Sequence, residues 1–162
     1  MSLSRVTCNR LHIQGLVDVD DETLADVAPW LRLAWIVCAA LALVGVVLGS
    51  YKILWSSMIL SSWAMISPVH PVDLFYNHFL RRFTGTGSLP KRAAPTRFAC
   101  GLGTVWLFAT GWLFYTGAAL AGYIVGGVLV VVAGLVGTIH LCIPSMIYGA
   151  IFGRPQPKKK GV

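Results

Sequence analysis

The chain has 162 residues, of which 56% are hydrophobic and 12% charged, and its formal net charge is +7. Soluble domains carry roughly 25% charged residues, so this chain has too few polar side chains to cover a water-soluble globule. Its basic residues stand in short groups beside apolar segments, which argues against a nucleic-acid-binding face and suits lipid headgroups.

A polar leader opens the chain over residues 1–29 and contains every acidic residue except Asp73. Its acidic sequence at 20–22 predicts the start of a short helix, since acidic side chains stabilise a helix N-terminus. The leader lacks the basic start and short apolar core of a secretory signal. We therefore expect an acidic leader on the cytoplasmic side.

Two apolar runs follow the leader and predict the first two membrane spans. Residues 31–50, with Pro29 at the expected helix start, would cover a hydrocarbon core of about 30 Å. Residues 53–69 are shorter and rich in serine, so a tilted or re-entrant segment stays as an alternative to a full crossing. The sequence Ser-Pro-Val-His-Pro at 67–71 then ends the helix.

The segment at 72–83 predicts an amphipathic helix that lies at the membrane interface between spans two and three. Its leucine and phenylalanine residues recur at helical spacing, with Asn, His and Arg between them. The glycine, proline and basic residues at 84–96 predict an exposed loop.

The C-terminal half predicts two further spans, 98–116 and 118–139, joined as an antiparallel hairpin through a short turn at Gly117. Pro144 is expected to kink or end the fourth helix, with a short interfacial helix after it. The basic tail at 154–162 is expected to be disordered.

The distribution of basic residues sets the predicted topology. Four spans place every Lys and Arg except Lys52 on the side of the two termini, which satisfies the positive-inside rule. The predicted fold class is therefore all-α, an integral membrane four-helix bundle over residues 30–153. We expect a multi-pass protein of the plasma (inner) membrane with cytoplasmic N- and C-termini, in contact with the lipid bilayer and with no nucleic acid.

Candidate chemistry rests on cysteine and histidine, because the spans hold no acidic or basic residue near their centres. Cys100 and Cys142 should lie near the same ends of spans three and four and form a candidate thiol site, with apolar packing as the simpler role. His70 and His140 form a candidate polar or ligand site, with interfacial hydrogen bonding as the simpler role. A haem or another pigment at these histidines stays open, while no cofactor, metal site or catalytic residue is predicted.

Four short pieces of the sequence carry a resemblance. They are an acidic start at 18–21, Pro-Thr-Arg-Phe-Ala at 95–99, Gly101 with Gly103, and Cys142 followed by Tyr148. Together they resemble domain of unknown function 4395, an uncharacterised bacterial family of membrane proteins. Members often have Cys-x-x-Cys near the end of the last helix, and some are fused with thioredoxin-like or rhodanese-like domains, so the resemblance implies thiol-redox or sulfur handling. Here Ser145 replaces the second cysteine, which removes a local dithiol.

Glycines in small-xxx-small spacing allow helices to approach closely, inside the bundle or against a partner. They are Gly45, Gly49, Gly122 and Gly126. No nucleophile–base pair or phosphate loop occurs in the sequence, so enzyme activity is not expected. The leading hypothesis is a non-enzymatic accessory or structural membrane protein that packs against or recruits a membrane-protein partner, or forms a homo-oligomer. The alternatives are a membrane component of a thiol-redox or sulfur-handling system and a small oligomeric pore or transporter.

Overall fold

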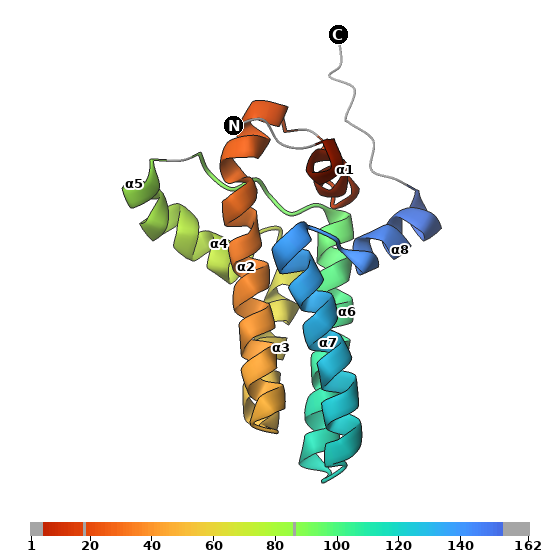
Figure 1. Cartoon of the computed structure of the whole chain (residues 1–162). Helices are drawn as coiled ribbons and strands as arrows, with labels where there is room; N and C mark the ends of the chain where they lie inside the picture. Colours follow the sequence, from red (N-terminus) through yellow and green to blue (C-terminus); the bar gives the residue numbers. More distant parts are fainter. Residues whose placement is uncertain (1–4, 18, 86, 154–162) are drawn as a thin grey trace.

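The computed structural model of the chain describes residues 5–17, 19–85 and 87–153, and this part contains helices and no strand (Figure 1). The predicted disordered tail at 154–162 lies outside the described residues. In chain order the helices are α1 (Arg5–Ile13), α2 (Asp21–Val47), α3 (Tyr51–Ile66), α4 (Pro71–Phe75), η1 (Tyr76–Leu80), α5 (Arg81–Thr84), α6 (Ala94–Tyr115), α7 (Ala119–Ile139) and α8 (Ile143–Phe152). The all-α prediction is confirmed.

Helices α2, α3, α6 and α7 lie side by side and form the body of the molecule (Figure 1). Helix α3 packs mainly along α6 and α2 mainly along α7, while contacts of α2 with α3 and of α6 with α7 close the arrangement. The two connections at the lower end of Figure 1 are tight turns. Each contains a glycine in the left-handed region, Gly49 at φ 57° and Gly117 at φ 81°, where other residues would be strained.

Among the described residues, three helices are long and apolar enough to cross a membrane, namely α2 from Glu22 onward, α6 and α7. Helix α3 has only 16 residues. In the most apolar window of each of the three long helices, only 22% to 28% of the residues are buried. Water would therefore meet most of this apolar surface if the chain were soluble, and lipid is the solvent that suits it.

The small-xxx-small glycines are used for packing within the chain. A Cβ at Gly45 would lie 2.9 Å from the Leu54 side chain of α3, and one at Gly126 would lie 2.5 Å from the Val46 side chain of α2. Helices can approach this closely only where no side chain intervenes. Two further glycines of the set, Gly49 and Gly122, face the Phe114 ring.

The first long helix begins at Asp21 rather than at residue 31. Asp20 is its N-cap, because the Asp20 carboxylate accepts a hydrogen bond of 2.9 Å from the Thr23 N–H. The acidic sequence that predicted a short helix therefore starts the long one. Pro29 lies inside α2, not at its start, so the prediction for Pro29 is wrong. It lacks the N–H of an interior helical residue and leaves one carbonyl of the preceding turn without its helical partner.

The fourth long helix ends at the predicted residue, Ile139, but Pro144 does not end it. Helix α7 stops at Ile139 because His140 adopts the left-handed conformation, with φ 55°, and caps it. Pro144 does not end α7. It stands in the first turn of α8, where the missing N–H of proline costs nothing.

Residues 71–84 form one continuous helical stretch, α4–η1–α5, which projects from the side of the bundle (Figure 1). We call it the projecting segment. Its phenylalanine rings are exposed and stack in a row, with centroids 5.6 Å apart for Phe75 and Phe79 and 5.4 Å for Phe79 and Phe83. Arg81 and Arg82 contribute to a polar surface on the same stretch. The prediction of a helix over 72–83 is therefore confirmed in its helical conformation, with a π-helical turn at the centre of the segment.

Candidate functional site

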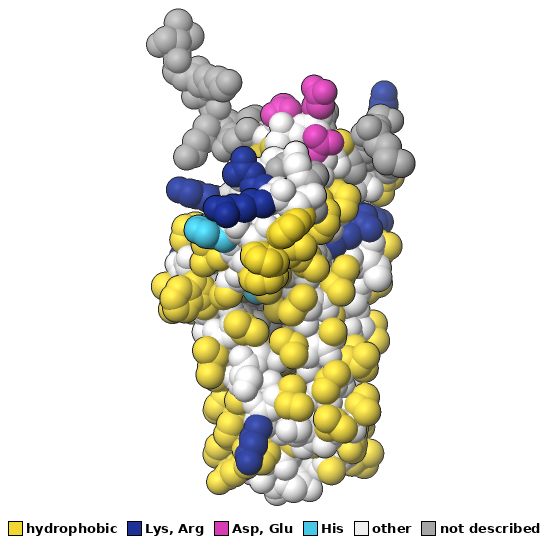
Figure 2. Space-filling view, turned by 90° about the vertical axis from the view of Figure 1, so that its left-hand side faces the viewer, with side chains coloured by type: hydrophobic (Ala, Val, Ile, Leu, Met, Phe, Trp, Pro, Cys, Tyr) yellow, Lys and Arg dark blue, Asp and Glu magenta, His cyan; other side chains and the backbone are white. Residues whose placement is uncertain are grey.

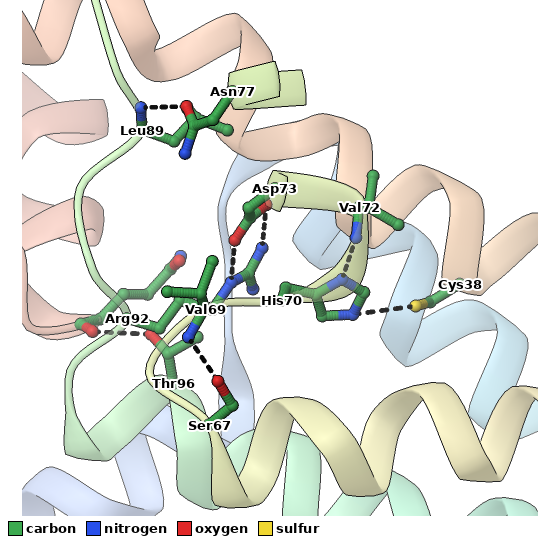
Figure 3. Close-up of polar contacts among 11 residues, drawn as sticks. Cys38, Ser67, Val69, His70, Val72, Asp73, Asn77, Leu89, Arg92 and Thr96 are labelled. Atoms are coloured by element: carbon green, nitrogen blue, oxygen red, sulfur yellow. Dashed lines mark hydrogen bonds and ion pairs between the residues drawn. The ribbon is translucent and has the colours of Figure 1, made fainter. Parts of the chain in front are cut away.

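The loop before α6, predicted to be exposed, carries a buried arginine. The Arg92 guanidinium donates two hydrogen bonds to the Asp73 carboxylate, 2.6 Å from Nε to Oδ2 and 2.9 Å from Nη2 to Oδ1 (Figure 3). Their side chains are only 5% and 3% exposed. The Arg92 N–H also donates to the Pro68 carbonyl at 2.8 Å. This two-pronged ion pair fixes the turn after α3 against the start of α6.

The charge of Arg92 is retained in this environment. Burial by itself would lower the pKa of Arg92, but the hydrogen bonds and negative charge of Asp73 outweigh that effect and raise it. The Trp35 ring lies 5.6 Å from the guanidinium carbon and adds a cation–π contact. A permanent positive charge is thereby held inside the end of the bundle, where an unpaired ion would be very costly.

His70 caps α4 and at the same time faces a cysteine. Its Nδ1 accepts a hydrogen bond of 3.1 Å from the Val72 N–H, so the ring proton of the neutral form sits on Nε2. Nε2 lies 3.7 Å from the Cys38 sulfur (Figure 3). Burial, assisted by the charge of Arg92, lowers the pKa of His70 to about 4. Neutral His70 therefore directs an N–H toward Cys38 and has no free nitrogen to take the thiol proton, which rules out a cysteine–histidine base pair in this geometry.

These groups meet at one cavity. A cavity of about 60 Å³ is lined by Cys38 of α2, Ser61 of α3, His70, Arg92 and Cys100 of α6, together with apolar side chains and Gly103. We call it the thiol chamber. The buried positive charge of Arg92 and the His70 N–H act in favour of an anionic sulfur, whereas burial of the two cysteines outweighs them and favours the neutral thiols. The volume suits a water molecule or a very small ligand.

A second polar cluster ties the N-terminal helix to the end of α7. Arg32 Nε donates to His140 Nε2 at 2.7 Å, Gln14 Nε2 donates to the His140 carbonyl at 2.9 Å, and Arg10 donates to the Ile139 carbonyl at 2.8 Å. These donors satisfy carbonyl groups that a helix C-terminus leaves unpaired, and their charge suits its negative end. We call this cluster the α7 latch.

The α7 latch should weaken in acid. Burial, with the charges of Arg32 and Arg10, lowers the pKa of His140 to about 4, below an unfolded value of about 6.5. Between about pH 4 and pH 6.5 the unfolded chain therefore binds more protons at His140 than the folded chain does. The stability that neutral His140 contributes is complete above about pH 6.5 and is lost as the pH falls toward 4. We expect the melting temperature to fall over that range. His140→Asn should flatten the pH profile, and an identical profile would contradict the assignment.

Cys142 lies at the junction of α7 and α8, outside the wall of the thiol chamber. Its sulfur lies 3.0 Å from the Ser145 hydroxyl, and it packs with Ala99 and Val136. Burial raises the pKa of the Cys142 thiol. Position 145 therefore faces position 142, in the geometry that a Cys-x-x-Cys pair would use, although Ser145 stands there.

The structure does not keep the predicted site residues in the pairs that the sequence suggested. Cys100 lies in the thiol chamber, whereas Cys142 lies outside its lining and contacts Ser145. His70 and His140 belong to separate clusters, and haem ligation by this pair would have to break the contacts of His70 Nε2 or His140 Nε2.

Sequence reasoning missed three members of the site, Cys38, Asp73 and Arg92. The sequence did contain one indication of the ion pair, because Asp73 is the single acidic residue outside the leader. An isolated acid among many basic residues is expected to find a counter-charge.

Within the described residues, no group of three or more His, Cys, Asp or Glu side chains is placed to hold a metal ion. In comparisons with known proteins, a family model described as "Domain of unknown function (DUF4395)" matches residues 26–152. The match includes the thiol chamber and leaves α1 outside it. The chain matches no curated protein and no solved structure.

Proposed function

The chain belongs to this family, whose description assigns no activity, and we propose a membrane topology and a function from its own geometry. We propose that α3 is a fourth span, so that α2, α3, α6 and α7 all cross the bilayer with both termini cytoplasmic. At 1.5 Å per residue a helix of 16 residues is about 24 Å long. A helix of this length can cross a bilayer that is thin or locally thinned around it. Basic side chains gather at the end of the molecule that carries α1 and α5 (Figure 2), while Lys52 lies in the first turn of α3 at the other end.

Cysteine labelling from outside the cell tests this topology. A membrane-impermeant maleimide should label Lys52→Cys and Ala118→Cys in intact cells, in a background where the native cysteines are serines. Lys91→Cys should react only after the membrane is opened. Labelling of Lys52→Cys and Lys91→Cys from the same side would contradict a crossing by α3.

We further propose that the protein is the membrane component of a thiol-redox or sulfur-handling system. One observation carries this proposal, namely the thiol chamber. Cys38 and Cys100, from two different helices, share one cavity with a buried guanidinium and a histidine N–H. Helix packing alone would be served by apolar contacts, whereas this set of groups offers a hydrogen-bond donor and a positive charge to the sulfur atoms.

The division of tasks follows from the contacts. Arg92 supplies fixed positive charge, Asp73 holds Arg92 in position, and His70 donates an N–H to the Cys38 sulfur. Neither His70 nor Arg92 is placed to remove a proton. The chamber is therefore suited to hold two thiols or their oxidised form away from water and to exchange them with a partner, rather than to catalyse hydrolysis.

Differential thiol trapping in native membranes tests the proposal. Cells are treated with diamide or with sodium polysulfide, and mass spectrometry then follows the state of each cysteine. We expect Cys38 and Cys100 to change state reversibly, and Cys38→Ser to alter the response of Cys100. Cys8→Ser, in α1, serves as the matched control and should leave both responses unchanged. Thiols that stay reduced under every treatment would end the proposal.

A non-enzymatic accessory role is the second candidate, and the projecting segment favours it. The exposed row of Phe75, Phe79 and Phe83 suits the acyl-chain boundary, and Arg81 and Arg82 suit lipid phosphates or an acidic partner. Crosslinking from a photoreactive residue at position 82 should capture a discrete protein partner in native membranes. Capture of lipid alone would remove this candidate.

A further inference from the structure

An apolar groove of about 470 Å³ lies between α6, α7 and α8. This volume falls within the roughly 300–1,000 Å³ of small-molecule sites. Trp35 and Trp106 contribute aromatic walls, and Cys142 contributes a thiol at the end nearest α8. The remaining lining is almost entirely aliphatic, so the groove can recognise a hydrophobic molecule but not a water-soluble metabolite.

The groove opens toward the surface that lipid would cover. Leu102 and Val105 on α6 and Ile147 on α8 line it and are also exposed. In the proposed topology it lies at the cytoplasmic half of the membrane, because it occupies the first part of α6 and the last part of α7. A ligand dissolved in the bilayer could therefore enter sideways without crossing water.

The groove shares a wall with the thiol chamber. Trp35, Ala99, Gly103, Leu129 and Ala133 line both spaces. A Cβ at Gly103 would meet no atom within 4 Å, so this glycine faces open space and is not needed for a helix contact. Small residues at this wall leave room for a flat ring beside the indole of Trp35.

We propose that the groove binds a lipid-soluble quinone, which serves as the electron acceptor for the thiols. This inference rests on the thiol function proposed above. Oxidation of the Cys38 and Cys100 thiols of the thiol chamber would form one S–S bond and release two electrons and two protons. The two electrons would reduce the quinone ring, the two protons would bind its two carbonyl oxygens, and the product would leave as the quinol, so the reaction balances. A quinone accepts two electrons and two protons, and its lipid-soluble form dissolves in the acyl chains that adjoin the groove.

Tryptophan fluorescence of the full chain in lipid nanodiscs tests the binding step. Decyl-ubiquinone should quench the fluorescence saturably, since Trp35 and Trp106 line the groove. Gly103→Leu should fill the shared wall and raise the dissociation constant about tenfold or more, because it removes ligand volume without a clash. Gly134→Leu is the matched control, since it also adds a side chain in open space on α7 but outside the groove. Both variants should keep the wild-type melting temperature.

The outcomes separate this inference from the thiol function. Absence of saturable quenching, or equal affinity in Gly103→Leu, would overturn the quinone site even where trapping shows active thiols. Equal competition by decylbenzene, which has the same chain but no carbonyl groups, would overturn it in favour of an acyl-chain site. Quinone binding that depends on Gly103, together with inert thiols in native membranes, would support the binding site but refute both the redox function and the role of the quinone as its electron acceptor.

Discussion

Arg92→Met should destabilise the protein by about 3–5 kcal/mol, because it leaves the Asp73 carboxylate buried without its counter-charge. The pair also connects two parts of the chain, since Asp73 lies in α4 and Arg92 in the loop before α6. Loss of the pair should therefore free the projecting segment as well as the thiol chamber. Thermal unfolding in detergent, followed by fluorescence-detected size exclusion, measures the effect.

The matched double variant distinguishes charge from packing. Arg92→Met with Asp73→Leu should recover most of the stability lost in either single variant, because no isolated buried charge remains. Arg82→Met, which removes an exposed charge, should change the melting temperature little. Single variants as stable as the wild type would show that the pair is solvated, contrary to its burial.

The helices could be predicted because hydropathy and helix-breaking sequences act locally. The break at 67–71, the turn at Gly117 and the helical conformation of 72–83 follow from neighbouring residues, and all are present. Pro29 and Pro144 show where local reasoning fails. Pro29 was assigned to a helix start and Pro144 to a helix end from the positional preferences of proline, whereas these boundaries are set by the Asp20 cap and by His140.

The site could be predicted only in part, for a related reason. Cys100 and His70 stand out as polar or reactive residues near predicted helix ends. Cys38 does not, because one cysteine in an apolar helix looks like a packing residue. Its importance comes from His70, which a separate element brings within 3.7 Å. The buried position of Arg92 is likewise set by Asp73. A basic residue in a loop is usually exposed, so the sequence does not indicate this burial.

The small-xxx-small glycines illustrate how the structure changes a functional argument. The sequence left open whether they face a partner or the bundle. Gly126 packs against Val46 on α2, and its neighbour Gly127 has no atom within 4 Å of an added Cβ. A partner's helix can therefore use the side of Gly127, but not the side of Gly126.

Gly126→Leu should consequently lower the free energy of unfolding by about 1–3 kcal/mol, because the new side chain must force α2 and α7 apart. Gly127→Leu, one residue along the same helix, should leave that free energy unchanged or raise it slightly, since leucine is the better helix former. Unfolding of both variants in the same detergent, with size exclusion to follow association, measures the contrast. A stable Gly126→Leu protein that had lost a bound partner or its own oligomer would show that this face serves an interface. The contact between α2 and α7 would then not be needed to close the bundle around the thiol chamber.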